Sequence, residues 1–266
     1  MRRTAALLLA AATLTTGAVA TVSSGVGAAP PRVGKLISQC NSAGQVALPT
    51  GVSTYQSGSA RLSRDCFIMV PADSKLVLRA VRIVGPHNLY ILGNPSGAAR
   101  SKVVVRNSTI SVGKDLFITA GRRSSGYSPG AGVVVTNSTI RGDFVGVYAS
   151  RKNRNGSVVI LDSKVRARES RVVIWASTDR RVNGLARVQR TRINAESGIE
   201  IQTGRRGTTT ATSNTLIADD LKVLSGFRGT TKFLRNTLDV KNERVGTGAQ
   251  GTCVAGPSNT PTVTCD

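Results

Sequence analysis

The chain has 266 residues and carries 36 Lys and Arg against 14 Asp and Glu, a formal net charge of +22. Such an excess of positive charge points to anionic partners or surfaces, with a solubility role as the plainer alternative. The single histidine argues against a metal centre built from Cys and His ligands.

The first 20 residues have the pattern of a secretory signal peptide. Arg2 and Arg3 precede the apolar run Ala5–Leu14, and small residues occupy Ala18 and Ala20 ahead of a cleavage point. A second cleavage point fits after Ala29. The apolar run is too short to span a membrane. We therefore expect an exported, extracellular protein without a membrane span.

Four cysteines suit an oxidising compartment. Cys40 and Cys66 lie near the start of the mature chain, and Cys253 and Cys265 lie at its end. Three pairings are open. We favour the two local disulfides, each of which would staple one end of the molecule.

Between the cysteine pairs a repeat of about 27 residues recurs. One element ends on an aliphatic residue, two small residues and a basic cluster, as in "ITAGRR" (118–123) and "IQTGRR" (201–206). The other element is "VVVTNSTI" (133–140) and its relatives, two β-like runs joined by a polar bend. Three short β-like runs in each repeat are what one turn of a parallel β-solenoid needs. The aliphatic anchors are Ile91, Ile118, Val147, Ile174, Ile201 and Val223.

The segment "VVVTNSTIRGDFVGVYAS" (133–150), with Asn137 at a tight bend, resembles the repeat of right-handed parallel β-helix proteins of the pectate-lyase-like superfold. The resemblance covers about residues 75–245. We expect an all-β, single-stranded right-handed parallel β-helix of about six to eight coils with three short strands per coil. The expected domains are a signal peptide (1–20), an N-terminal cap and first coil (21–74), the β-helix (75–245) and a C-terminal cap (246–266).

The resemblance also implies roles for positions in each coil. The anchor strand is the first strand, "VVV" the second and "STI" the third, and family members usually bind sugar chains on the first-strand face. Asn at the bend often stacks as a ladder in this family. Asn107, Asn137 and Asn236 fit that pattern, Asp162 fits it in part and Arg190 does not.

Strand alternation sorts each anchor strand into an inward and an outward face. The anchors and the aliphatic residues two positions before them should point inward. The outward columns should then carry an aromatic platform on which sugar rings or bases stack. A terminal segment, residues 21–70 or 246–266, folded over this face is the alternative. One outward column consists of Tyr90, Phe117, Gly146, Val173, Glu200 and Lys222, and the other of Leu92, Thr119, Tyr148, Trp175, Gln202 and Leu224.

Basic residues follow the anchor strands at a common phase, so stacked coils would align them as one stripe. Arginine forks suit carboxylate, sulfate and phosphate groups, whereas ordinary solvated turns are the simpler interpretation. The stripe comprises Arg122, Arg123, Arg151, Lys152, Arg154, Arg180, Arg181, Arg205, Arg206 and Arg228.

Acidic residues precede the anchor strands, in turns where stacking would make them repel. Ion pairs with Arg141, Arg166, Arg168 and Arg192 would neutralise them, and calcium is the alternative. We favour the ion pairs. The acids are Asp115, Asp143, Glu169, Glu196, Asp219 and Asp220.

These features favour a secreted module that binds an anionic polysaccharide or cell-wall polymer along the first-strand face. The binding residues would be the outward aromatics, Gln202 and the arginines of the stripe. No cofactor is expected, oligomeric state is not indicated beyond a preference for a monomer, and export argues against nucleic acid as a partner.

The first alternative is a polysaccharide lyase that cleaves a polyuronate by β-elimination, with Lys222, Arg205 and Glu200 as catalytic candidates. Calcium would then be held by Glu196, Glu200 and Asp220. The second alternative is a structural surface protein without a ligand groove. His87 has no evident acid or nucleophile partner, and we assign it to a turn.

Overall fold

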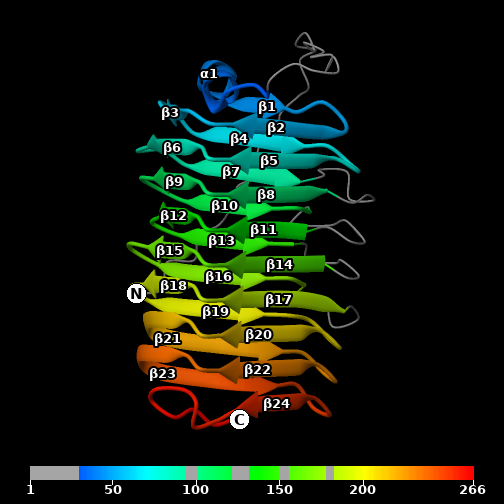
Figure 1. The fold of residues 1–266 in the computed structure, drawn as a ribbon, viewed down its shortest axis with the longest axis vertical. Coiled ribbons are helices and arrows are strands. Elements are labelled where there is room, and N and C mark those ends of the chain that lie inside the picture. The colour runs from blue at the N-terminus through cyan, green and yellow to red at the C-terminus, as the bar shows by residue number, and fades with distance from the viewer. Residues whose placement is uncertain (1–29, 94–100, 122–131, 150–155, 178–182) are drawn as a thin grey trace, which may run out of the picture.

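The computed structural model describes residues 30–93, 101–121, 132–149, 156–177 and 183–266. These residues form a parallel β-helix of about seven turns, with 59% of the described residues in strands and one helix. The predicted fold class is thereby confirmed. Each turn stacks on the previous one along a single long axis, as the column of labelled strands in Figure 1 shows.

The strands form three ladders in which every neighbouring pair is parallel. The first ladder contains the predicted anchor strands. It consists of β1 Gln45–Ala47, β4 Cys66–Val70, β7 Leu89–Gly93, β10 Leu116–Thr119, β13 Val145–Tyr148, β16 Arg171–Trp175, β19 Gly198–Gln202 and the second halves of β21 Thr215–Ser225 and β23 Thr237–Thr247.

The second ladder is a separate sheet that contains the "VVV" runs. It consists of β2 Val52–Gln56, β5 Lys75–Arg79, β8 Lys102–Arg106, β11 Gly132–Thr136, β14 Gly156–Leu161, β17 Gly184–Gln189, β20 Thr208–Thr212, β22 Thr230–Leu234 and β24 Thr252–Ala255.

The third ladder contains the "STI" runs and joins the first ladder through the long strand β21, so that both belong to one sheet. It consists of β3 Ser59–Arg61, β6 Arg82–Gly85, β9 Thr109–Val112, β12 Thr139–Gly142, β15 Lys164–Ala167, β18 Arg192–Ala195 and the first halves of β21 and β23.

The core confirms the predicted register of the first ladder. From β7 to β21 its two inward columns are aliphatic, and no member is more than 2% exposed. A shift by one residue would instead bury Glu200 and Lys222. The inward residues are Leu89, Leu116, Val145, Val172, Ile199 and Leu221 with the six anchors.

A further interior column, made of polar residues, lies at the bend between the second and third ladders. The hydroxyl of Ser138 accepts a hydrogen bond from the backbone N–H of Ser108 (3.1 Å) and donates to the carbonyl of Thr136 (2.7 Å). Ser163 repeats this arrangement one coil further on. In the last coils amides replace the hydroxyls, and Asn236 accepts from the backbone N–H of Asn214 at 3.0 Å. These pairs satisfy groups that would otherwise be buried without partners.

The predicted asparagine ladder needs one correction. Asn107 and Asn137 adopt the left-handed conformation at the bend, with φ of 49° and 47°, and their side chains hydrogen-bond at 3.0 Å. The equivalent position in the later coil is Arg235 (φ 57°), so Asn236 belongs to the buried polar column next to it. The last coils are shorter than the earlier ones. Matching Asn236 to Asn107 and Asn137 therefore aligned the last coils one residue out of register.

Arg190 continues the bend column although it does not match asparagine. Its φ is 48°, and its guanidinium donates two hydrogen bonds to the Asp162 carboxylate at 2.5 and 2.9 Å. Hydrogen bonding from Arg190 holds the pKa of Asp162 below its usual range. An ion pair thus replaces the amide pair between these two coils.

Each end of the coil stack is closed by a short segment and a disulfide. Helix α1 (Val33–Ala43) buries Val33, Leu36 and Ile37 over the first coil. At the other end the segment after β24 buries Val263. The disulfides Cys40–Cys66 and Cys253–Cys265 confirm the two local pairings. Within the described part of the chain, no helix is long and apolar enough to cross a membrane.

Candidate ligand-binding face

Six aromatic side chains form a continuous row on the outer face of the first ladder. Ring centroids lie 4.7 Å apart for Phe67 and Tyr90, and 5.3 Å apart for Tyr90 and Phe117. The row continues from Phe117 to Tyr148 at 6.1 Å. We call Phe67, Tyr90, Phe117, Phe144, Tyr148 and Trp175 the aromatic row.

The rings of the aromatic row stack on one another rather than lying flat on the sheet. The planes of Phe67 and Tyr90 differ by 7°, and those of Tyr90 and Phe117 by 13°. Because the coils repeat at about 4.8 Å, rings at equivalent positions meet face to face. The predicted row is therefore present, but its stacked rings turn their faces toward neighbouring coils and their edges outward.

Gly146 explains how the row passes from one outward column to the other. A Cβ at this position would lie 2.4 Å from Cε2 of Tyr148 and 2.9 Å from Cε1 of Phe144. These two rings occupy the space that a side chain at position 146 would take, and both approach Phe117. The glycine thus lets Tyr148 bridge the two columns.

Trp175 differs from the stacked rings. Its plane makes 84° with that of Tyr148, at a centroid distance of 5.7 Å. The side chain is half-buried, and its indole nitrogen is buried without a hydrogen-bond acceptor in the described part of the chain. The exposed part of the indole is consequently its carbon framework, which suits contact with an apolar face of a ligand.

Phe67 and Phe144 were missed by the sequence analysis. Phe67 lies on β4, where it pairs with Tyr90 in register, and is 38% exposed. Extending the predicted repeat by one coil toward the N-terminus would have placed Phe67 in the aromatic row. Phe144 lies in the turn before β13, and alternation along a strand gives no signal for it.

A charged hollow of about 380 Å³ continues the same face beyond the aromatic row. Glu200 and Lys222 both line it, with Lys222 Nζ 3.6 Å from Glu200 Oε1. The Glu200 side chain is 17% exposed and also accepts a hydrogen bond from Gln202. The polar side chains that line the charged hollow are Arg171, Ser197, Glu200, Asp220, Lys222, Asn242, Glu243 and Arg244.

The structure brings together some of the predicted catalytic and metal-binding residues. Lys222, Glu200 and Asp220 all line the charged hollow, whereas Glu196 is exposed outside its lining. Asp220 accepts a hydrogen bond from Asn242 at 2.9 Å. Across the described residues, no group of three or more His, Cys, Asp or Glu side chains is placed to hold a metal ion.

Arg205 lies apart from these residues. Its guanidinium packs over the ring of Phe227 at 4.6 Å from the centroid, and Arg228 packs against the same ring at 5.2 Å. This arrangement is a pair of cation–π contacts, which stabilises the turn itself. Arg206 is exposed. The other residues of the predicted basic stripe, from Arg122 to Arg181, lie outside the described residues.

The predicted acidic rim is neutralised at some positions by ion pairs. Arg168 pairs with Asp143 at 2.8 Å, and Lys241 pairs with Asp219 at the same distance. Asp219 and Asp220 lie inside the continuous strand β21 rather than in a turn, which corrects their predicted placement. Burial, reinforced by the charges of Asp143 and Asp65, raises the pKa of Asp115.

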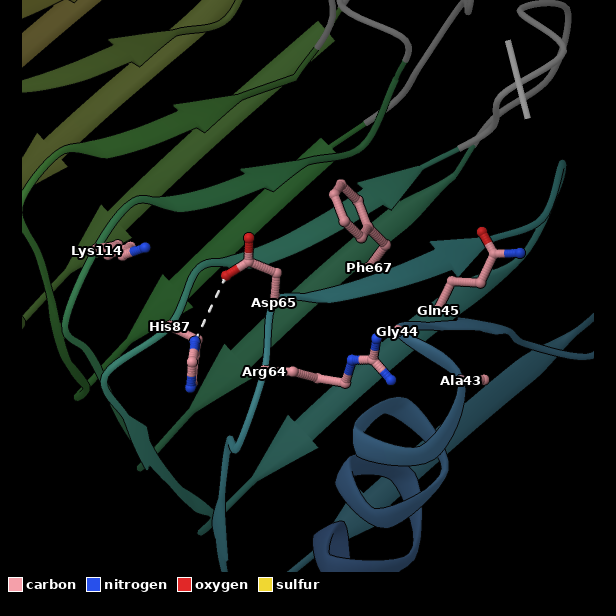
Figure 2. A pocket seen from close by; sticks show the side chains of 8 residues that line it. All are labelled: Ala43, Gly44, Gln45, Arg64, Asp65, Phe67, His87 and Lys114. Atoms are coloured by element: carbon pink, nitrogen blue, oxygen red, sulfur yellow. Dashed lines mark ion pairs between the residues drawn. The ribbon is translucent and has the colours of Figure 1, made fainter. Parts of the chain in front are cut away.

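A second hollow, of about 510 Å³, lies at the N-terminal end of the aromatic row (Figure 2). Phe67 forms part of its wall, together with Arg64, Asp65, His87 and Lys114. Nδ1 of His87 is 3.8 Å from the Asp65 carboxylate, so His87 has an acidic neighbour, while its place in the bend between β6 and β7 confirms the assignment to a turn. The lining contains no Ser, Thr or Cys side chain that could act as a nucleophile.

Comparisons of the chain with protein-family models, with curated proteins and with solved structures find no match. The fold and the geometry of the first-ladder face therefore carry the functional argument alone.

Proposed function

We propose that this protein is an exported β-helix module that binds a linear anionic polysaccharide along the outer face of the first ladder. The observation that carries the proposal is the junction on strand β16. Trp175 at the end of β16 closes the aromatic row, and Arg171 at its start lines the charged hollow.

The chemistry of the two parts fits the two sides of an acidic sugar. The outward carbon edges of the stacked rings and the exposed carbon framework of Trp175 match the apolar faces of sugar rings. Arg171, Lys222 and Arg244 in the charged hollow match carboxylate or sulfate groups. A polymer that follows the coil axis meets both parts in succession, whereas a small ligand meets one.

Export is part of the proposal and has its own support. The N-terminal segment has the charge and apolar pattern of a signal peptide. The two disulfides close the ends of the coil stack. Disulfides form and persist outside the reducing cytoplasm. The net charge of +22 adds a long-range attraction for acidic polymers.

Binding of polygalacturonate oligomers to the mature chain, measured by calorimetry, tests the proposal. We expect Trp175→Ala and Lys222→Gln each to weaken binding by about tenfold, as for loss of one stacking contact or one charged hydrogen bond. Lys232→Gln, an equal charge change on the second ladder, is the matched control and should have little effect. Equal losses in Lys222→Gln and Lys232→Gln, with none in Trp175→Ala, would reject this face as the site.

The grouping of Lys222 with Glu200 and Asp220 favours one second candidate, a polyuronate lyase. A basic side chain would remove the proton beside the sugar carboxylate, and the glycosidic oxygen would leave with the electron pair. Lys222 would first have to release Glu200, which is why we prefer binding without turnover. Ultraviolet absorbance of the same mixtures, with added calcium, decides the matter. Unsaturated product that disappears in Lys222→Gln but persists in Lys232→Gln would establish the lyase.

A further inference from the structure

Four basic side chains form a grid on the outer face of the third ladder, away from the aromatic row and the charged hollow. Arg141 on β12 is the direct register partner of Arg166 on β15, and Lys164 on β15 is the partner of Arg192 on β18. All four side chains are exposed. We call Arg141, Lys164, Arg166 and Arg192 the basic grid; its strands lie directly above one another in Figure 1.

The basic grid contains like charges at the closest spacing that a solenoid allows. Register partners on neighbouring strands are about 4.8 Å apart, and like charges placed directly opposite each other destabilise a sheet. Arg141, Arg166 and Arg192 were expected to neutralise acids in the neighbouring turns. In the structure none of these three forms an ion pair with a described acidic residue.

Three acids of the neighbouring turns and strands pair with other cations. Asp143 pairs with Arg168, Asp162 with Arg190, and Asp219 with Lys241. The remaining outward positions on β9, β12, β15 and β18 are Thr109, Ser111, Thr139 and Asn194, which are neutral groups able to donate hydrogen bonds. The face is therefore an array of donors that contains no carboxylate on these four fully described strands.

We propose that the basic grid is a second, independent binding site, for a linear polyuronate. Such a polymer carries one carboxylate on each sugar ring, a regular charge repeat that suits cations repeated once per coil. Arginine forks and the adjacent hydroxyl and amide groups match the carboxylate and the sugar hydroxyls. Single-stranded nucleic acid is the weaker match, because its binding sites combine cations with aromatic rings and β12, β15 and β18 carry no aromatic residue.

The second ladder supplies a matched control. Arg79 and Arg106 are also exposed register partners on adjacent coils. Together with Lys75 and Lys102 they flank Val77 and Val104, so these cations are divided by an apolar column and span two coils. The basic grid spans three coils, its cations are direct outward neighbours, and the polar residues Thr139 and Asn194 lie beside them.

The test compares two double variants of the full mature chain with defined polygalacturonate oligomers at an ionic strength of about 0.15 M. Arg141→Gln with Arg166→Gln should weaken one of the two binding events by about tenfold or more and leave the other unchanged, since it removes two charged hydrogen-bond donors from the grid alone. Arg79→Gln with Arg106→Gln removes the same charge and should weaken binding by about twofold at most. Lys164→Gln with Arg192→Gln is an independent second disruption of the grid, expected to match the first.

Each outcome decides the proposal. Similar losses in the grid and control variants would mean general charge attraction and would overturn it, as would a lowered unfolding temperature in both grid variants. Tighter binding of a single-stranded oligodeoxynucleotide, lost in the grid variants, would replace polyuronate by nucleic acid. Trp175→Ala separates the two proposals: a loss of binding in that variant but not in the grid variants sinks the grid site alone, and the reverse sinks the first-ladder site alone.

Discussion

The two halves of the first-ladder face meet the same constraint in different ways. From β4 to β16 each strand carries one outward aromatic residue, and from β19 to β23 each strand carries at least one outward charged residue. In both halves register partners on neighbouring coils lie about 4.8 Å apart. Aromatic rings tolerate this spacing because they stack, as Phe67, Tyr90 and Phe117 do.

Charges at the same spacing must alternate in sign or find another partner. Glu200 is followed by its register partner Lys222, which pairs with it. Arg244 comes next in the column and lies 3.8 Å from the carboxylate of Asp266. The aromatic half is therefore stabilised by stacking between similar rings, and the charged half by pairing between opposite charges. The basic grid follows neither rule, and this is why it points to an external anion.

The largest expected effect comes from removing the central ring of the aromatic half. Phe117 contacts Tyr90, Phe144 and Tyr148. Phe117→Ala should lower the free energy of unfolding by about 2 to 3 kcal/mol through lost burial and lost ring pairs. Urea denaturation measures this change, and near-ultraviolet circular dichroism reports the loss of ring order.

A ring outside the row serves as the control for Phe117. Phe227 is half-buried and contacts the guanidinium groups of Arg205 and Arg228. Phe227→Ala should cost about 1 kcal/mol less than Phe117→Ala, because it breaks no ring pair. An equal or greater cost at Phe227 would show that stacking along the aromatic row contributes nothing to stability.

The charged half can be tested by giving both members of its central ion pair the same charge. Lys222→Glu would place a second carboxylate opposite Glu200, and should destabilise the protein by about 1 kcal/mol. Combining Lys222→Glu with Glu200→Lys exchanges the signs and should recover most of that loss. Thermal unfolding of the two single variants and the double variant measures the coupling. A double variant no more stable than Lys222→Glu alone would contradict the pairing.

The sequence was sufficient for the coil architecture because its signal is repeated in every coil. The inward column from Leu89 to Leu221 is aliphatic throughout, and only one register buries all of it. The disulfides followed from proximity to the two ends. Short repeats were the weak point: Asn236 was assigned to the exposed bend, and Asp219 and Asp220 to a turn that the continuous strand β21 replaces.

The site was less predictable, because its properties depend on side-chain orientation. Alternation places Tyr90 and Phe117 outside the core, yet it cannot show that their faces cover each other. The path of the row through Tyr148 depends on the absence of a side chain at Gly146, which has meaning only once neighbouring coils are in place. Likewise, Arg205 belongs to a basic turn in the sequence, and only the fold places it over Phe227.

The smallest expected effect lies in the turn before β10, beside the aromatic half, where charge is unbalanced. Burial and the nearby carboxylates of Asp143 and Asp65 raise the pKa of Asp115. The folded state therefore holds the Asp115 proton more tightly than the unfolded state does, and ionisation at neutral pH costs stability. Asp115→Asn should stabilise the protein at neutral pH by about a few tenths of a kcal/mol, the size expected for a partly exposed charge. The unfolding temperature should rise accordingly.

This gain at Asp115 should shrink as the pH falls through the raised pKa and vanish below 3.8, the usual value, where the carboxyl is protonated in both states. Asp219→Asn provides the opposite case, since Asp219 pairs with Lys241 at 2.8 Å and its loss should lower the unfolding temperature at neutral pH. A gain from Asp115→Asn that persists unchanged at about pH 3 would not be electrostatic. The sign of the difference between these two variants therefore tests directly whether pairing between coils, rather than the charge itself, decides the stability of this edge.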